Sequence, residues 1–320
     1  MTNPIVADSA EASEAALSSV DLTSSGFDST QARRQSLVIL KRFMRHRAAM
    51  VSLAIFVLLF LIAFVGGALW KYSYTYEDTT GGGRYLPPSG QHPFGTDALA
   101  ADNMAQVLRG TQFSLLIALV VAFLATTLGV VLGAIAGFYR GWVDSLVSRF
   151  TDLVLVIPPV VLAGVLSRNA IGGGGSNWYL IAIYLGITSW MSVCRVIRGM
   201  VLSLREKEFV EAARALGGSA PRLIFRHILP NTLDVIIVNA TIAVSQAVLA
   251  EAALSFIGLG VHPPDTSLGL LIEKNQNEIS LHPWLFWFPF VFIVLISLSV
   301  NFIGDGLRDA FDPRQKRVRA

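Results

Sequence analysis

The stretch from Glu208 to Asn231 reads EFVEAARALGGSAPRLIFRHILPN and lies between two long apolar runs. Acidic residues stand at its start, where the dipole of a helix favours negative charge. The alanines that follow have high helix propensity and little bulk, so another protein surface can approach closely. Gly217-Gly218 can supply the left-handed residue that ends such a helix. The sequence therefore predicts a short amphipathic helix that begins near Glu208 and ends at Gly217.

A second helix is predicted directly after this glycine pair. Pro221 suits the first turn of a helix, and Pro230 interrupts the helix just before the next apolar run. We expect the whole loop over 195–234 to form a compact helix-turn-helix that projects from the membrane.

The composition identifies the chain as an integral membrane protein. Hydrophobic residues make up 53% of its 320 residues and charged residues only 15%, which lies outside the range of ordinary soluble domains. A membrane-crossing helix needs about 20 apolar residues. The clearest candidates are Ala48–Trp70, Thr111–Tyr139, Asn177–Cys194, Val235–Ala250 and Trp284–Gly304.

A sixth span is predicted over Leu153–Ser167, kinked by Pro158-Pro159. With six spans, 20 of the 25 Lys and Arg residues fall on one side, which the positive-inside rule makes cytoplasmic. A re-entrant segment at Pro158-Pro159 would remove this asymmetry. We therefore expect an all-α integral membrane protein with six transmembrane helices and cytoplasmic N- and C-termini.

Four regions are expected along the chain. Residues 1–35 form a disordered cytoplasmic tail, because residues 1–32 contain neither Lys nor Arg and are rich in Ser and Ala. Residues 36–105 hold an amphipathic helix on the inner membrane surface, the first transmembrane helix and an outer loop. Residues 106–312 form a core with five transmembrane helices, and residues 313–320 form a basic cytoplasmic tail.

The spacing of the quoted stretch resembles the EAA loop of ABC importer permeases. Glu211-Ala212-Ala213 is followed six residues after the glutamate by Gly217, and Leu229-Pro230 stands 18 and 19 residues after it, as in that family. The ending His227-Ile228-Leu229-Pro230-Asn231 is similar to the dipeptide, oligopeptide and nickel subgroup.

Further segments resemble the C-type permease subunit of that subgroup. They are HPFGTD (92–97), RGTQFSL (109–115) and LSFIGLGVHPPDTSLGLLI (254–272), so the similarity covers about residues 37–313. One departure is Ala100-Ala101, where the family usually has Gly-Arg.

The resemblance implies the type I ABC importer permease fold in a bacterial inner membrane and a non-catalytic permease subunit. The implied partners are a homologous second permease, two ATPase subunits that bind ATP and Mg, and an extracytoplasmic binding protein that meets the outer segment Glu251–Pro283. The chain itself would need no cofactor. The residues implied in coupling to the ATPase are Glu208, Glu211, Ala212, Ala213, Leu216, Gly217, His227, Leu229 and Pro230.

The translocation pathway needs inward-facing polar groups, because polar side chains are costly against lipid. The fifth span offers Asn239, Thr241, Ser245, Gln246 and Glu251. Such side chains also bridge helices, so a packing role stays open for each of them.

The sequence offers little support for other kinds of site. The five histidines show no metal-ligand spacing, and Gly172–Gly175 is not followed by the Lys-Ser or Lys-Thr of a phosphate loop. The basic residues adjoin the membrane, which argues against nucleic acid as a partner. The leading interpretation is a dipeptide or oligopeptide permease. A nickel-chelate or other small-solute permease, an ion-coupled secondary transporter and a membrane anchor remain as alternatives.

Overall fold

The computed structural model describes residues 29–76, 83–158, 160–164 and 178–311, which are predominantly helical and, within these ranges, form no β-strand beyond an isolated bridge between Thr96 and Asp102. The chain divides into two compact units, residues 1–42 and 43–320. Five helical stretches of the described residues are long and apolar enough to cross a membrane: Arg47–Leu69, Asn103–Tyr139, Trp178–Leu204, Ala220–Phe256 and Pro283–Phe311.

Each of these stretches overlaps one of the five clear predicted spans, and most extend beyond them. The first combines α3 (Arg47–Leu61), a π-helical turn over Ile62–Gly66 and α4 (Gly67–Leu69). The others are α5 (Asn103–Tyr139), α8 (Trp178–Leu204), α11 (Leu233–Phe256) and α13 (Pro283–Phe311). Because α8 continues to Leu204 and helical turns resume at Ala220, the loop predicted over 195–234 is shorter in the structure.

The predicted sixth span is divided between described and undescribed residues. Helix α6 (Gly141–Val156) ends two residues before Pro158, as expected where proline removes a backbone donor, and residues 160–164 are helical again. The rest of the predicted span, residues 165–167, lies outside the described residues.

The amphipathic helix predicted from residue 36 corresponds to α2 (Ser29–Arg45), which begins earlier. In the first compact unit, Leu37 and Leu40 are exposed, as an apolar face that meets lipid requires. Residues 1–28, and with them most of the predicted N-terminal tail, lie outside the described residues, as does the predicted basic tail over 313–320.

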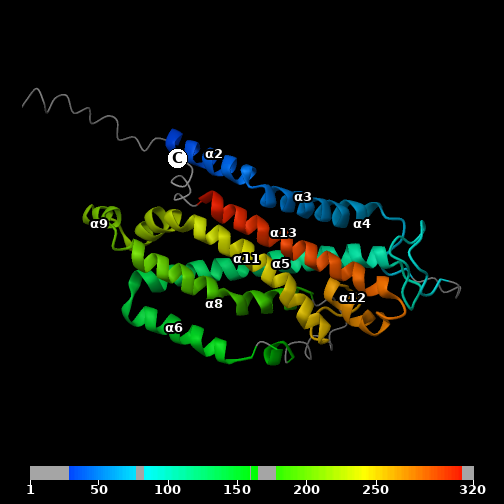
Figure 1. Cartoon of the computed structure of the whole chain (residues 1–320). Coiled ribbons are helices and arrows are strands. Elements are labelled where there is room, and N and C mark those ends of the chain that lie inside the picture. The colour runs from blue at the N-terminus through cyan, green and yellow to red at the C-terminus, as the bar shows by residue number, and fades with distance from the viewer. Residues whose placement is uncertain (1–28, 77–82, 159, 165–177, 312–320) are drawn as a thin grey trace, which may run out of the picture. The chain divides into compact units, whose positions relative to one another are not determined.

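Helices α5 and α8 pack closely along their length (Figure 1). Gly129, Gly133 and Gly137 recur every four residues on the face of α5 that meets α8. A Cβ atom at Gly133 would lie 2.6 Å from the carbonyl oxygen of Cys194, and one at Gly137 2.8 Å from that of Arg198. Small residues therefore allow the two backbones to approach, as is common between membrane helices.

Helices α11 and α13 lie beside α5 in the second unit (Figure 1), and side chains from α3, α5, α8, α11, the short helix α12 (Leu268–Asn275) and α13 form the main buried apolar cluster. The ends of these helices meet at two opposite ends of the second unit, each defined by contacts between neighbouring helices. At what we call the α9 end, Arg140 contacts Glu206, and His46 lies 3.4 Å from Asp309. At the α12 end, Ser114 of α5 contacts Glu251 of α11 and the start of α12.

Candidate functional site

The predicted helix at Glu208 is present as α9 (Glu208–Ala215). Lys207 precedes it with extended backbone, and Glu208 and Glu211 occupy the first turn, where the helix dipole favours their charge. Glu208, Glu211 and Ala212 are exposed, while Ala213 is half-buried.

Gly217 ends α9 in the conformation predicted for it. Its φ angle is +82°, in the left-handed region that side chains disfavour. The Gly217 N–H donates to the Arg214 carbonyl and the Gly218 N–H to the Ala213 carbonyl, each over 3.0 Å. This pair of hydrogen bonds is the Schellman motif, which satisfies carbonyl groups at a helix end. The predicted glycine cap is therefore confirmed.

One side of α9 is fixed to the rest of the protein and the other is open. Val210 is fully buried and belongs to a cluster with Leu223, Ile224 and Ile228. In contrast, Leu216 is 89% exposed and Phe209 is 42% exposed. Phe225, after the glycine turn, is also exposed. Large exposed apolar side chains at one end of the protein are typical of a surface that binds another protein.

The second predicted helix begins where expected, and its α-helical geometry is interrupted around Pro230, as predicted, while the helical path continues into α11. Pro221 lies in the first turn of α10 (Ala220–Arg222). Wider π-helical turns follow over Leu223–Ile228, and a 3-10 turn over Leu229–Thr232 leads into α11. Proline at the second position of this 3-10 turn changes the hydrogen-bond pattern without ending the helical path. His227 and Leu229 are half-buried, and Pro230 is exposed.

Charged contacts join the base of this segment to α5. The Arg205 guanidinium donates to the Phe138 carbonyl, and the Arg140 guanidinium donates to Glu206. Desolvation, together with the nearby charges of Arg140 and Arg214, lowers the pKa of Arg205, which still remains charged because arginine titrates far above neutral pH. A displacement of α9 would therefore act on the ends of both α5 and α8.

The polar residues of α11 separate into different environments. Asn239 is half-buried, and its Nδ2 donates to the Val235 carbonyl over 2.8 Å, whereas Gln246 is exposed on the same helix face. Thr241 donates to the Val238 carbonyl and would contact a Cβ at Gly304 of α13. Ser245 is buried and donates to the Ser297 carbonyl of α13 over 3.2 Å.

Glu251 is fully buried at the α12 end of α11. Its Oε2 accepts a hydrogen bond from Ser114 of α5 over 2.9 Å, and its Oε1 accepts one from Ser255 over 2.7 Å. Ser255 Oγ in turn lies 3.4 Å from Ser267 Oγ, which caps α12. These bonds link α5, α11 and α12.

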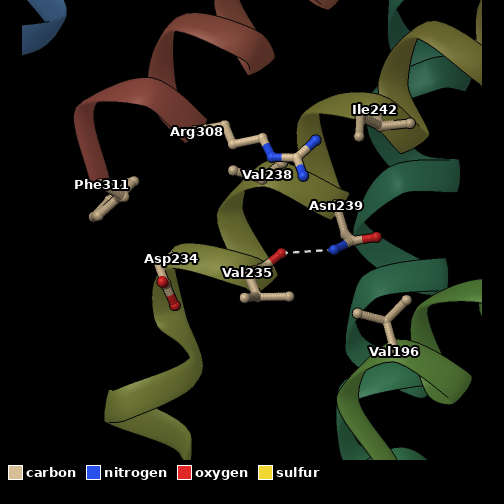
Figure 2. Close-up of a pocket in the computed structure, with 8 residues that line it drawn as sticks. All are labelled: Val196, Asp234, Val235, Val238, Asn239, Ile242, Arg308 and Phe311. Atoms are coloured by element: carbon tan, nitrogen blue, oxygen red, sulfur yellow. Dashed lines mark hydrogen bonds between the residues drawn. The ribbon is translucent and has the colours of Figure 1, made fainter. Parts of the chain in front are cut away.

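A cavity of about 440 Å³ lies between α8, α11 and α13 at the α9 end (Figure 2). Of the polar residues predicted for the pathway, Asn239 lines it. Sequence reasoning did not select the two charged residues there, Asp234 of α11 and Arg308 of α13. The only sequence signal was a charge at the end of an apolar run, which also suits a simple membrane flank.

The outer turn that departs from the family pattern has a clear backbone requirement. Ala100 has a φ angle of +62°, so the glycine usual in the resembled family fits this position better than alanine. Asp97 accepts hydrogen bonds from the Leu99 and Ala101 N–H groups, each over 2.9 Å. The turn therefore keeps its shape although the glycine is replaced.

Taken together, the apolar helices define a multi-span membrane protein with an exposed, partly apolar helix at one end. Residues 129–317 match the family described as binding-protein-dependent transport system inner membrane component, and residues 36–88 match the N-terminal TM domain of oligopeptide transport permease C. The chain belongs to this family of multi-pass inner membrane components.

Named relatives extend the match over most of the chain. The oligopeptide transport system permease protein OppC of Mycobacterium tuberculosis is 41% identical over 288 residues, which are 90% of this chain and 97% of that protein. OppC of Haemophilus influenzae is 39% identical, over 86% of this chain and 88% of its own length.

Among solved structures, a chain of the MetNI methionine ABC transporter superposes with a TM-score of 0.54 and 20% identity, covering 65% of this chain and 98% of that one. At this identity the match supports the type I importer permease fold and no more.

Proposed function

We propose that this chain is a permease subunit of an ATP-driven importer for dipeptides or oligopeptides. The family match and the names of the relatives support this function. The chain would form the translocation pathway together with a homologous second permease. It would take substrate from an extracytoplasmic binding protein, and two partner ATPase subunits would bind ATP and Mg and catalyse hydrolysis.

Six membrane crossings, with the α9 end in the cytoplasm, fit the contacts of the described helices. Helices α5 and α8 run in the same direction: Phe113 near the start of α5 lies against Trp178 at the start of α8, and Arg140 after α5 contacts Glu206 after α8. The chain must therefore cross back between them. Asp144 at the start of α6 contacts Arg198, and Gly164 lies near Leu259 beyond the far end of α11, which supports a return crossing that includes α6.

The observation that carries the coupling role is the exposed, glycine-capped helix α9. Leu216 extends into solvent directly before the cap, while Val210 anchors the opposite side of the helix. A groove on an ATPase subunit would bind the apolar side chains, with Glu208 and Glu211 as polar contacts and Ala212 and Ala213 allowing close approach. His227, Leu229 and Pro230 would position the second helix. Motion of the ATPases would then reach α5 and α8 through Arg205 and Glu206.

For the pathway we retain Asn239 and Gln246, which share the accessible face of α11. Ser245 and Glu251 are buried and hydrogen-bonded between helices, and Thr241 faces α13, so we assign these three residues to helix packing.

The test is uptake of a labelled dipeptide by cells that lack the chain, complemented at matched membrane levels. Leu216→Asp places a charge in the proposed interface without touching the buried cluster, so uptake should be lost while the protein stays folded. Leu216→Met keeps an apolar side chain of similar volume and should transport normally.

Normal uptake by the Leu216→Asp protein would remove the docking role. If the native chain does not restore dipeptide uptake, the same cells should be tested with longer peptides and nickel chelates, and uptake independent of the ATPase subunits would refute the importer function.

A further inference from the structure

The cavity at the α9 end has the size and lining of a small-ligand site. Its volume of about 440 Å³ lies in the range of roughly 300–1,000 Å³ usual for such sites. The walls are mostly apolar, with a few polar groups from two helices. The lining residues are Val196, Asp234, Val235, Val238, Asn239, Ile242, Arg308 and Phe311 (Figure 2).

The two charges in the cavity are opposite in sign and unpaired. Asp234 lies in the first turn of α11, and Arg308 lies in the last turn of α13. Neither forms an ion pair with the other or with any other residue that the structure describes. Figure 2 shows the Arg308 guanidinium directed from α13 toward Val238 and Asn239 of α11. Both residues therefore stand where α11 and α13 end at the α9 end, and they place two opposite charges at the mouth of one apolar cavity.

Asn239 adds an uncharged polar group to the lining of the cavity. Because its Nδ2 donates to the Val235 carbonyl, the side-chain oxygen of Asn239 is left as an acceptor without a partner among the described residues (Figure 2). The neighbouring Val235, Val238 and Ile242 offer apolar contacts on the same helix.

The face of α11 that lines the cavity continues toward the proposed pathway. Val235, Asn239, Ile242 and Gln246 follow one another at spacings of four, three and four residues and so lie on one face of the helix. Gln246 is exposed at the far end of this stripe. The cavity is thus placed where a solute that moves along this face toward the cytoplasm would arrive.

We propose that this cavity is a release site for short peptides with free termini. Arg308 binds the peptide's α-carboxylate, Asp234 binds its α-ammonium group, and the apolar walls accept a side chain. Asn239 accepts a hydrogen bond from a peptide N–H. A free peptide carries the two opposite charges that the cavity leaves unpaired. The inference deepens the proposed peptide permease function and rests on it.

The site can be probed directly from the cytoplasmic side. The chain has a single cysteine, Cys194, which is buried. In Val238→Cys the new thiol would therefore be the accessible one for N-ethylmaleimide. In inside-out vesicles that contain the assembled transporter, bound trialanine should slow the reaction of this thiol with N-ethylmaleimide. Trialanine amide, which lacks the carboxylate, should protect at least about 10-fold less well, because a hydrogen-bonded charge pair is lost.

Variants of the two charged residues test the assignment of each peptide end. Arg308→Gln in the Val238→Cys background should raise the half-protecting concentration of trialanine about 10-fold and leave that of trialanine amide unchanged. Asp234→Asn should likewise raise the half-protecting concentration of trialanine about 10-fold. It should leave that of N-acetyl-trialanine unchanged, because this peptide has no α-ammonium group. Arg308→Lys retains the positive charge and should retain most of the protection.

Equal protection by trialanine and its amide, or protection by neither, would overturn the proposal.

If Val238→Cys is not labelled at all, Val196→Cys serves in its place, because Val196 is 41% exposed and lines the same cavity. Dipeptide uptake is measured separately in cells. Normal peptide uptake without protection would reject the release site and leave the permease function standing, whereas protection without ATP-dependent uptake would reject the permease function.

Discussion

Replacing Gly217 separates the backbone requirement of α9 from its contacts. Its φ angle is +82°, and a Cβ atom there would meet nothing within 4 Å, so Gly217→Ala introduces no clash. An L-residue in the left-handed conformation costs roughly 1–2 kcal/mol. The cost falls on the end of α9, where two hydrogen bonds of 3.0 Å depend on this turn.

If docking requires the capped helix, a cost of 1–2 kcal/mol lowers the ratio of capped to uncapped helix by a factor of about 5–30, and dipeptide uptake at limiting expression should fall by up to that factor. Gly217→Asn should keep more activity than Gly217→Ala, because asparagine tolerates the left-handed region. Hydrogen exchange at the Gly217 and Gly218 amides of the purified protein should rise in the alanine variant.

Gly199→Ala is the matched control, since Gly199 lies within α8 and a Cβ there also meets nothing within 4 Å. Its uptake should equal that of the native chain. Equal uptake by the alanine and asparagine variants at Gly217, with unchanged amide exchange, would show that the left-handed cap has no part in transport.

Three further predictions concern stability, measured as thermal unfolding of the purified protein in detergent. Gly133→Ala places a Cβ 2.6 Å from the Cys194 carbonyl oxygen and should cost about 1–3 kcal/mol, whereas Gly199→Ala should be neutral; a native midpoint for Gly133→Ala would refute the close approach of α5 and α8. Ala100→Gly should stabilise the protein by about 1 kcal/mol because it relieves the positive φ angle, and Ala101→Gly, in the same turn without that angle, should not; a loss of stability in Ala100→Gly would contradict this account. Glu251→Leu leaves the buried Ser114 and Ser255 hydroxyls without their acceptor and should cost about 1–3 kcal/mol for each, while Glu251→Gln, which keeps one acceptor oxygen, should cost less; equal effects would show that hydrogen bonding is not what Glu251 contributes.

The sequence predicted those structural elements that depend only on residues close together in the chain. An apolar run long enough to cross the bilayer is a property of consecutive residues, so all five clear spans were placed, with errors mainly at their ends. The cap of α9 was predicted for the same reason, because a left-handed turn selects glycine at that position. Pro230 was predicted to interrupt the helix before the next span; at this point the π-helical turns give way to a 3-10 turn, yet the helical path continues into α11.

Contacts between distant residues were decided by the tertiary structure alone. The polar residues of α11 could be recognised from the sequence, but only packing shows that Glu251 is buried against α5 while Gln246 is exposed. Likewise, Asp234 and Arg308 stand at the ends of two separate apolar runs, and their meeting in one cavity depends on how α11 and α13 pack. Sequence periodicity gives the face of a helix on which a residue lies, whereas the partner of that face is set by the long-range arrangement of the other helices.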